Sequence, residues 1–230
     1  MAYPLFLTIK NTPADRDIPA LRKMLELSFP RKENNAYIDA LCQGSLPRVT
    51  AQRLGALSLL PSLLSEAGIP TQDLVLVRDG YGRPRITFAD GCPAGFDFNL
   101  SHTDTHVAAA LLLGNGRVGV DVEEFISPAR AIPLIRRYCT EGELSLLGDS
   151  ADDQLSADFF TATWVKREAL AKQEGQGMPL RYDTANLPSE IMLWHGCLSG
   201  TNTHIAVCAP KTDAPASPVI LSDSLPVQFA

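Results

Sequence analysis

The stretch DFNLSHTDTHVAAALLLGNGRVGVDVE, residues 97–123, contains three runs of strand-forming residues in close succession. Residues 97–101, 106–113 and 117–123 are rich in apolar side chains, and polar or glycine-containing residues separate them. The segment Leu113–Val118, with Gly-Asn-Gly at its centre, is typical of a hairpin turn. These patterns predict a series of short strands in which the last two form a hairpin.

Helical patterns lie on both sides of this stretch. Leucines recur at helical spacing over residues 50–67 and predict one helix that packs on a sheet. Beyond residue 124 the pattern predicts helices that begin at Ser127-Pro128 and at the capping box 140–143, and a long helix over residues 152–174. Further strands are predicted at residues 3–9, 74–77, 85–88, 191–195 and 204–208. Strands and helices without regular βαβ alternation predict an α+β fold.

The chain of 230 residues is long enough for one large domain or two small ones. If there are two halves, we place the boundary near Gly116, which gives an N-terminal half over residues 1–116 and a C-terminal half over 117–210. Residues 211–230 contain several prolines and are predicted to form a loosely held tail.

Composition narrows the classes of function. Hydrophobic residues make up 45% of the chain and charged residues 20%, as in ordinary globular proteins. A net charge of −6 argues against broad binding to nucleic acid or to anionic membranes. Five cysteines without a CxxC pair favour a reducing compartment, and no apolar run approaches the length of a membrane span. We expect a cytoplasmic protein that binds neither nucleic acid nor membranes.

Two carboxylates end the last strand of the quoted stretch. Asp121 and Glu123 are two residues apart, so they share one face of the strand, while the three valines at positions 118, 120 and 122 take the other. Burial of the valines places the two acids side by side, which favours a cation between them. Oxygen ligands of this kind suit Mg²⁺. The alternative is an exposed strand end with two solvated acids.

The long helix supplies a second polar row. Trp164, Glu168 and Lys172 follow at i, i+4 and i+8 and therefore lie on one face. As an alternative, Glu168 and Lys172 form only a surface ion pair. The opposite face is predicted to carry the apolar stripe that packs on the core, formed by Leu155, Phe159, Ala162, Ala169 and Leu170.

Ser101 and His102 are adjacent in a predicted strand and should point to opposite faces. They therefore do not form a nucleophile–base pair, and the chain has no GxSxG motif. His102 is suited to contact a phosphate, although a purely structural role is the alternative. With His106 it forms an HxxxH pattern, but the softer ligands that zinc prefers are missing nearby.

Together these segments resemble the phosphopantetheinyl transferases of the Sfp-like class. The resemblance runs from about Arg48 to Cys208. Its motifs, in order, are Gly82-Arg-Pro84, Phe98-Asn-Leu-Ser-His102, Gly119-Val-Asp-Val-Glu123 and Trp164-Val-Lys-Arg-Glu-Ala-Leu-Ala-Lys172. The chain departs from the family at Arg167, where the family usually has lysine.

The resemblance implies a monomer of two pseudo-twofold-related α+β halves, with coenzyme A and Mg²⁺ in the cleft between them. The N-terminal half would form the coenzyme A side and the C-terminal half the metal and catalytic side. It implies a holo-[acyl-carrier-protein] synthase type of activity. Such an enzyme transfers the 4'-phosphopantetheine arm of coenzyme A to a serine of an acyl, aryl or peptidyl carrier protein, in fatty acid, polyketide or nonribosomal peptide synthesis, and releases 3',5'-ADP.

The resemblance also implies roles for individual residues. Asp121, Glu123 and Glu168 would bind the metal and, with Lys172, form the catalytic group, in which we choose Glu168 as the general base. The residues expected to bind coenzyme A are Arg53, Gly82, Arg83, Pro84, Ser101, His102 and Lys172. Two alternatives remain open: a metal-dependent hydrolase of coenzyme A or a related diphosphate, and a non-catalytic coenzyme A-binding module.

Overall fold

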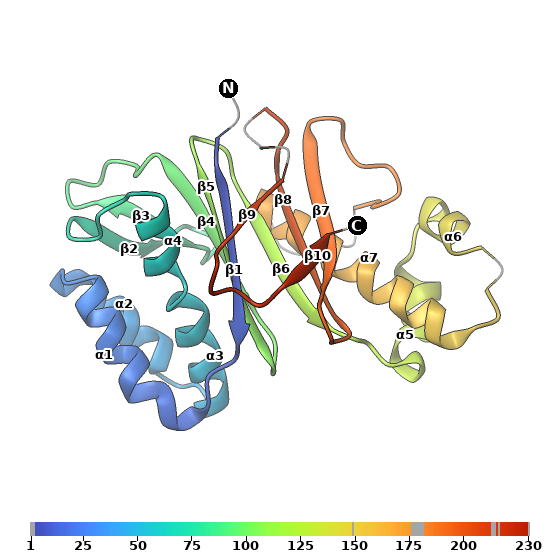
Figure 1. The fold of residues 1–230 in the computed structure, drawn as a ribbon, viewed down its shortest axis with the longest axis horizontal. Helices are drawn as coiled ribbons and strands as arrows, with labels where there is room; N and C mark the ends of the chain where they lie inside the picture. Colours follow the sequence, from blue (N-terminus) through green and yellow to red (C-terminus); the bar gives the residue numbers. More distant parts are fainter. Residues whose placement is uncertain (1–2, 149, 176–181, 213–214, 216, 230) are drawn as a thin grey trace.

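The structure is a computed structural model that describes residues 3–148, 150–175, 182–212, 215 and 217–229 (Figure 1). In chain order its elements are β1 (Leu5–Asn11), η1 (Asp15–Asp17), α1 (Ile18–Ser28), α2 (Lys32–Cys42), α3 (Pro47–Leu57), α4 (Leu60–Glu66), β2 (Leu74–Arg78), β3 (Pro84–Phe88), β4 (Phe96–His102), β5 (His106–Leu113), β6 (Gly119–Glu124), α5 (Pro128–Tyr138), α6 (Glu141–Leu147), α7 (Asp153–Glu174), β7 (Ile191–Leu198), β8 (Thr203–Pro210), β9 (Val219–Ile220) and β10 (Val227–Phe229).

Two four-stranded sheets lie at the centre of the molecule, with helices on the outer side of each (Figure 1). The first has the strand order β4-β5-β1-β9 and the second β10-β7-β8-β6, and β2 and β3 form a separate pair. Helices α1 to α4 pack on the first sheet, and α5 to α7 lie beside the second. The α+β class predicted from the sequence is confirmed, whereas the domain boundaries and the pseudo-twofold relation stay predictions.

The core between the two sheets is built from alternating positions of their strands. Leu5, Leu7 and Ile9 of β1 meet Val120 and Val122 of β6 there, and all five are almost completely buried. Strand β5 is buried on both faces, because its other residues pack on the helices. Its uninterrupted apolar sequence follows from this double burial.

The hairpin predicted between β5 and β6 is wrong. Strand β5 pairs with β1 on one edge and with β4 on the other, so it has no free edge for β6. Strand β6 instead pairs with β8, in the second sheet. The segment Gly114–Val118 therefore carries the chain from one sheet to the other. The glycines of this segment correctly predict that the chain turns here, but they do not predict which strands pair on either side of the turn.

The single helix predicted over residues 50–67 is two helices in the structure. Helix α3 ends at Leu57 and α4 begins at Leu60, with Pro61 in its first turn. Proline is tolerated at this position but cannot continue an existing helix, because it lacks the N–H that the preceding turn requires. The sequence did not predict α1 and α2, which complete the helical layer on this side.

The apolar stripe predicted on α7 is only partly correct. Ala169 and Leu170 are buried, but Leu155 is 56% exposed. The helix is enclosed on more than one side, since Trp164 packs on Phe160 and Tyr138, with ring centroids 5.9 and 6.1 Å apart. A second face of this helix is therefore also covered.

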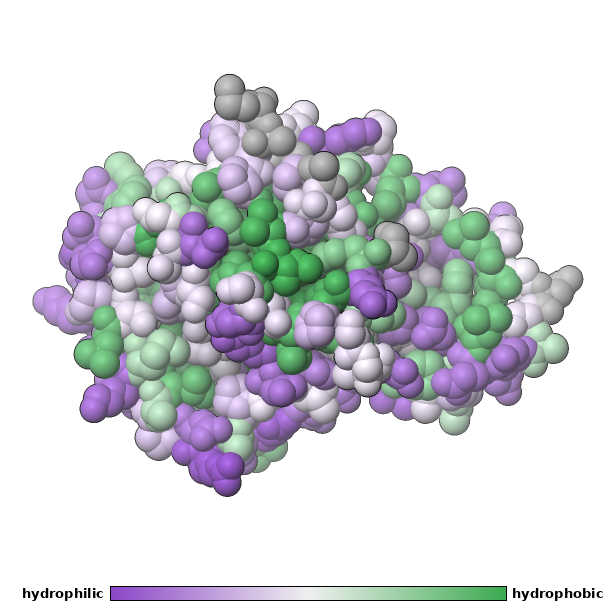
Figure 2. All heavy atoms as spheres, in the orientation of Figure 1, coloured by the Kyte–Doolittle hydropathy of each residue, from purple (hydrophilic) through white to green (hydrophobic). Residues whose placement is uncertain are grey.

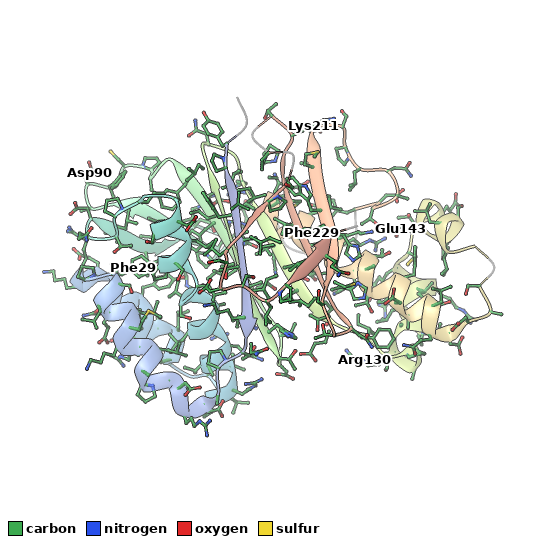
Figure 3. All side chains as sticks on the ribbon, in the orientation of Figure 1. Phe29, Asp90, Arg130, Glu143, Lys211 and Phe229 are labelled. Atoms are coloured by element: carbon green, nitrogen blue, oxygen red, sulfur yellow. The ribbon has the colours of Figure 1, made fainter. Side chains whose placement is uncertain are left out.

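The C-terminal segment is not the loosely held tail that its prolines predicted. Strand β9 pairs with β1, β10 pairs with β7, and the segment crosses from one sheet to the other (Figure 1). Figure 2 shows hydrophobic side chains gathered over this part of the surface. Leu225, Val227 and Phe229 pack against the core between the sheets, so the segment covers its open side (Figure 3).

Two further findings concern the whole described chain. All five cysteines are free thiols. Among the described residues, no helix combines the length and the apolar character needed to cross a membrane.

Candidate functional site

The two strand acids lie on one face of β6, as predicted. Val118, Val120 and Val122 are buried in the core between the sheets, and the side chain of Asp121 is 7% exposed on the other face. Glu123 is half-buried on the same face as Asp121. The alternative of two fully solvated acids is therefore excluded.

Helix α7 passes very close to β6, and Gly119 makes this approach possible. A Cβ atom at position 119 would lie 1.9 Å from the carbonyl oxygen of Ala169 and 2.7 Å from the backbone nitrogen of Gln173. No other residue type fits without displacing the helix. The close contact brings Glu168 and Lys172 to the acidic face of the strand.

Lys172, Asp121 and Ser101 form a compact hydrogen-bonded group. The ammonium of Lys172 donates to Asp121 Oδ1 at 2.5 Å and to Ser101 Oγ at 3.0 Å, and Ser101 Oγ donates to the same Asp121 oxygen at 2.7 Å. Lys172 is therefore the cation that pairs with Asp121 in this structure. Its contact is with the strand and not with Glu168, so the two do not form an isolated surface pair.

The carboxylates disfavour one another's charge. Burial, followed by the charges of Asp121, Glu124 and Glu168, raises the pKa of Glu123 to about 7. Burial and the charge of Asp121 also raise the pKa of Glu168. Acids from β6 and α7 therefore share one poorly solvated region, where a bound cation would relieve their repulsion.

The donor set suits Mg²⁺, but the acids do not already surround a single point. Asp121 Oδ2 is buried and has no hydrogen-bond partner, so it remains available as a ligand. All of the side-chain donors are carboxylate oxygens, which Mg²⁺ prefers. Within the described part of the chain, no group of three or more His, Cys, Asp or Glu side chains is arranged to hold a metal. Binding would therefore require side-chain rearrangement around Asp121.

His102 lies between two cavities. One, of about 260 Å³, is lined by Tyr37, Arg53, Arg78, Pro84 and His102, with leucines from α2, α3 and β4. The other, of about 350 Å³, is lined by His102, Glu123 and their neighbours and by Arg130 on α5 (Figure 3). Of the predicted residues, Arg53, Pro84 and His102 thus line the first cavity, and Glu123 lines the second.

The surroundings of His102 disfavour a positive charge on its ring. Burial lowers the pKa of His102, and the positive charges of Lys172 and Arg53 lower it further. Ser101, the preceding residue, points the other way, toward Asp121. The prediction that these two neighbours face opposite sides of the strand is confirmed.

The Gly82-Arg-Pro84 motif divides into three different positions. Gly82 is exposed in a turn with a φ of +84°, which favours glycine, and Pro84 lines the smaller cavity. Arg83 is buried, and its guanidinium donates to Asp97 Oδ2 at 2.6 Å and also to the carbonyl oxygen of Lys172. In the structure Arg83 therefore links β4 to α7, and its contact with coenzyme A stays a prediction.

Arg167, at the position where the family usually has lysine, is fully buried. It pairs with Glu143 of α6 and donates to the carbonyl oxygen of Tyr138 at 2.7 Å. A structural role accounts for the arginine, because its planar fork contacts two partners at once.

Sequence reasoning missed Tyr37, Arg78 and Arg130 at the cavities. The guanidinium of Arg78 lies 5.2 Å from the centre of the Tyr37 ring, so the two form one wall of the smaller cavity. Arg78 directly precedes the Asp79-Gly80 turn that the sequence does show, whereas no local pattern marks Tyr37.

Part of the chain matches the model of a known protein family. Residues 117–195, which include β6, α7 and the acids of the site, match the model of the 4'-phosphopantetheinyl transferase superfamily. This match and the relatives that follow confirm the Sfp-like resemblance inferred from the motifs.

Three relatives share 30% identity with the chain. They are the 4'-phosphopantetheinyl transferases gsp of Aneurinibacillus migulanus, over 54% of this chain and 48% of that protein, Sfp of Bacillus subtilis (strain 168), over 45% and 42%, and ffp of Bacillus subtilis, over 55% and 53%. The chain thus aligns with about half the length of the curated relatives it matches.

Proposed function

We propose that this protein transfers the 4'-phosphopantetheine arm of coenzyme A to a serine of an acyl, aryl or peptidyl carrier protein and releases 3',5'-ADP, as a holo-[acyl-carrier-protein] synthase does. The observation that carries the proposal is the position of His102 on the border of two cavities, one basic and partly apolar, the other acidic. The names of the three relatives support the same activity.

Coenzyme A would occupy the smaller cavity with its phosphates toward His102. Arg53 and Arg78 supply positive charge there, and Tyr37 and Leu57 supply apolar surface. The diphosphate would then extend past His102 toward Lys172. This path would be bordered by Gly82, Pro84 and Ser101. Arg83 would stabilise it indirectly, because its guanidinium donates to the carbonyl oxygen of Lys172.

Asp121, Glu123 and Glu168 would hold Mg²⁺, whose charge would offset the negative charge that develops on the diphosphate. Lys172 is already within hydrogen-bond distance of Asp121, so its ammonium would lie close to a phosphate held by a metal on these acids. Its ammonium would then donate to the phosphate oxygens, as would His102.

The transfer requires one proton acceptor. The carrier serine oxygen forms a bond to the β-phosphorus of coenzyme A, and the bond from that phosphorus to the bridging oxygen breaks. The 3',5'-ADP leaves with the electron pair, and Glu168 accepts the serine proton. Glu168 suits this role because its helix carries it to the same region as Lys172 and Asp121.

The test is to incubate the protein with coenzyme A, Mg²⁺ and an apo carrier domain and to weigh the carrier by mass spectrometry. We expect the carrier to gain the phosphopantetheine arm and 3',5'-ADP to appear in equal amount. Release of free 4'-phosphopantetheine with an unchanged carrier would instead identify a hydrolase. Binding of coenzyme A without any product would identify a binding module. Either outcome would refute the proposal.

A further inference from the structure

The two sheets meet at the edges of β4 and β6 without any backbone pairing between these strands. Strand β6 is hydrogen-bonded to β8 along its other edge. Toward β4, backbone N–H groups of β6 and of Val118 directly before it donate to side chains instead: Val118 to Asp97 Oδ2 at 2.9 Å, Val120 to Asn99 Oδ1 at 3.0 Å and Val122 to Ser101 Oγ at 3.3 Å.

These contacts recur at every second residue of both strands, which is the repeat of an extended backbone. Donors at every second position of β6 meet acceptors at every second position of β4, and both series run in the same direction along the chain. All three accepting residues, Asp97, Asn99 and Ser101, are at least 94% buried. We call these three residues the side-chain ladder. Without it, three buried N–H groups of β6 would have no acceptor on this edge, which is unfavourable.

The three members of the ladder differ in chemistry. Asp97 is held by the buried guanidinium of Arg83, and Ser101 belongs to the group that contains Lys172 and Asp121. Asn99, a neutral amide, lies between them. Its oxygen has to face β6, because an N–H donor requires an acceptor and the amide nitrogen is not one.

We infer that Asn99 is a positioning residue for the transfer reaction. This inference rests on the proposed function. Asn99 holds β6 in the register that places Asp121 beside Ser101 and places Glu123 at the cavity that His102 borders. A shift of β6 by one residue would turn both acids into the core between the sheets. Asn99 thus couples the coenzyme side to the acidic side without touching a reacting atom.

Three substitutions test this inference. Asn99→Leu keeps the volume but removes the acceptor, Asn99→Asp keeps an acceptor oxygen, and Asn34→Leu is the matched control. Asn34 is likewise a buried asparagine whose Oδ1 accepts a strand N–H, that of Leu76 at 2.7 Å, but it lies on α2, away from β6.

We expect Asn99→Leu to lower kcat at saturating coenzyme A about tenfold or more, because misplacements on the order of 1 Å can cost ~10²-fold. Its Kd for coenzyme A should stay within about threefold of the original protein, since the smaller cavity lies on the other side of β4. Asn99→Asp should retain more activity than Asn99→Leu. Asn34→Leu should lower Tm but keep kcat.

Hydrogen exchange and Mg²⁺ titration provide readouts that do not depend on transfer. The amide of Val120 should exchange slowly in the original protein and in Asn99→Asp and faster in Asn99→Leu, and Mg²⁺ should bind more weakly to Asn99→Leu. If the original protein transfers nothing, the proposed function fails, while these two readouts still test the register.

If Asn99→Leu does not fold, Asn99→Ser, with a shorter acceptor, replaces it. Fast Val120 exchange with unchanged kcat and Mg²⁺ affinity would overturn the inference.

Discussion

Arg167 on α7 and Glu143 on α6 form an ion pair in which both side chains are almost completely enclosed, at 1% and 0% exposure. Glu143 also accepts hydrogen bonds from the backbone of Thr140, in the capping box of α6, and from the backbone and hydroxyl of Thr184. The pair therefore ties α6 and the segment around Thr184 to the helix that carries Glu168 and Lys172.

Replacement of Glu143 by alanine would leave the Arg167 charge buried without its partner. We expect the free energy of unfolding to fall by about 3–5 kcal/mol, as is typical when one partner of a buried pair is removed. Urea denaturation followed by circular dichroism measures this change. Glu141→Ala, at an exposed position of the same helix, is the control. A loss below about 1 kcal/mol would show that the pair is not a stabilising contact.

The ionisation of the Glu143 carboxyl group should also affect how stability depends on pH. Burial opposes its charge, but hydrogen bonds from Thr140 and Thr184 and the charge of Arg167 lower the pKa of Glu143 overall. A lowered folded-state pKa adds stability above the pKa of the unfolded chain, and that stability is lost as the pH falls through the folded-state value. We expect acid unfolding below about pH 4.3, the ordinary glutamate range, to be less steep in Glu143→Gln than in the original protein. Identical slopes would contradict this assignment.

Replacement of Gly119 by alanine should separate α7 from β6. The added Cβ would lie 1.9 Å from the Ala169 carbonyl oxygen, so the helix has to move. We expect a stability loss of at least about 1–3 kcal/mol, the usual cost of overpacking, and a loss of transfer. Gly200→Ala is a useful comparison, because a Cβ there meets no neighbouring atom and only its backbone conformation is strained. Equal activity of Gly119→Ala and the original protein would show that the close approach is not needed.

Replacement of Lys172 by methionine should increase the response to Mg²⁺. The ammonium now pairs with Asp121 Oδ1 and therefore competes with any metal at that carboxylate. We expect a larger Mg²⁺-dependent rise in Tm for Lys172→Met than for the original protein, together with a loss of transfer. Lys166→Met, one residue before Arg167 on the same helix, controls for loss of a lysine. If Mg²⁺ changes neither Tm, the acids do not form a magnesium site.

Replacement of Glu168 by glutamine should remove the proton acceptor while keeping the shape of the side chain. We expect transfer to fall by about 10²–10⁴-fold, the usual contribution of a general base. Coenzyme A affinity, measured by calorimetry, should be nearly unchanged, because Glu168 does not line the smaller cavity. Glu190→Gln, at an exposed position, is the control. Full activity of Glu168→Gln would exclude it as the base.

Several features of the site could be predicted because they depend only on local periodicity. The alternation along β6 separates Asp121 from Val120 and Val122, and the alternation along β4 separates Ser101 from His102. The bounds of α7 were also close to the prediction, since Asp152 caps its start and Gly175 ends it with a φ of +72°. Each of these depends on residues only a few positions apart.

The remaining features depend on partners that are distant in the sequence. Arg83 and Arg167 look like surface or ligand-binding arginines until Asp97 and Glu143 are found beside them. The pairing of β5 could not be deduced from its own turn, because β1 and β4 already fill both of its edges.

The amino-acid sequence by itself determined which residues are acidic, basic or apolar on each strand and helix, because those faces follow from the repeat of the backbone. Only the tertiary structure decided which faces meet. The contact of α7 with β6 at Gly119 and the side-chain ladder from β4 to β6 join segments that no local signal connects, and burial of their polar groups is favourable only when both partners are present.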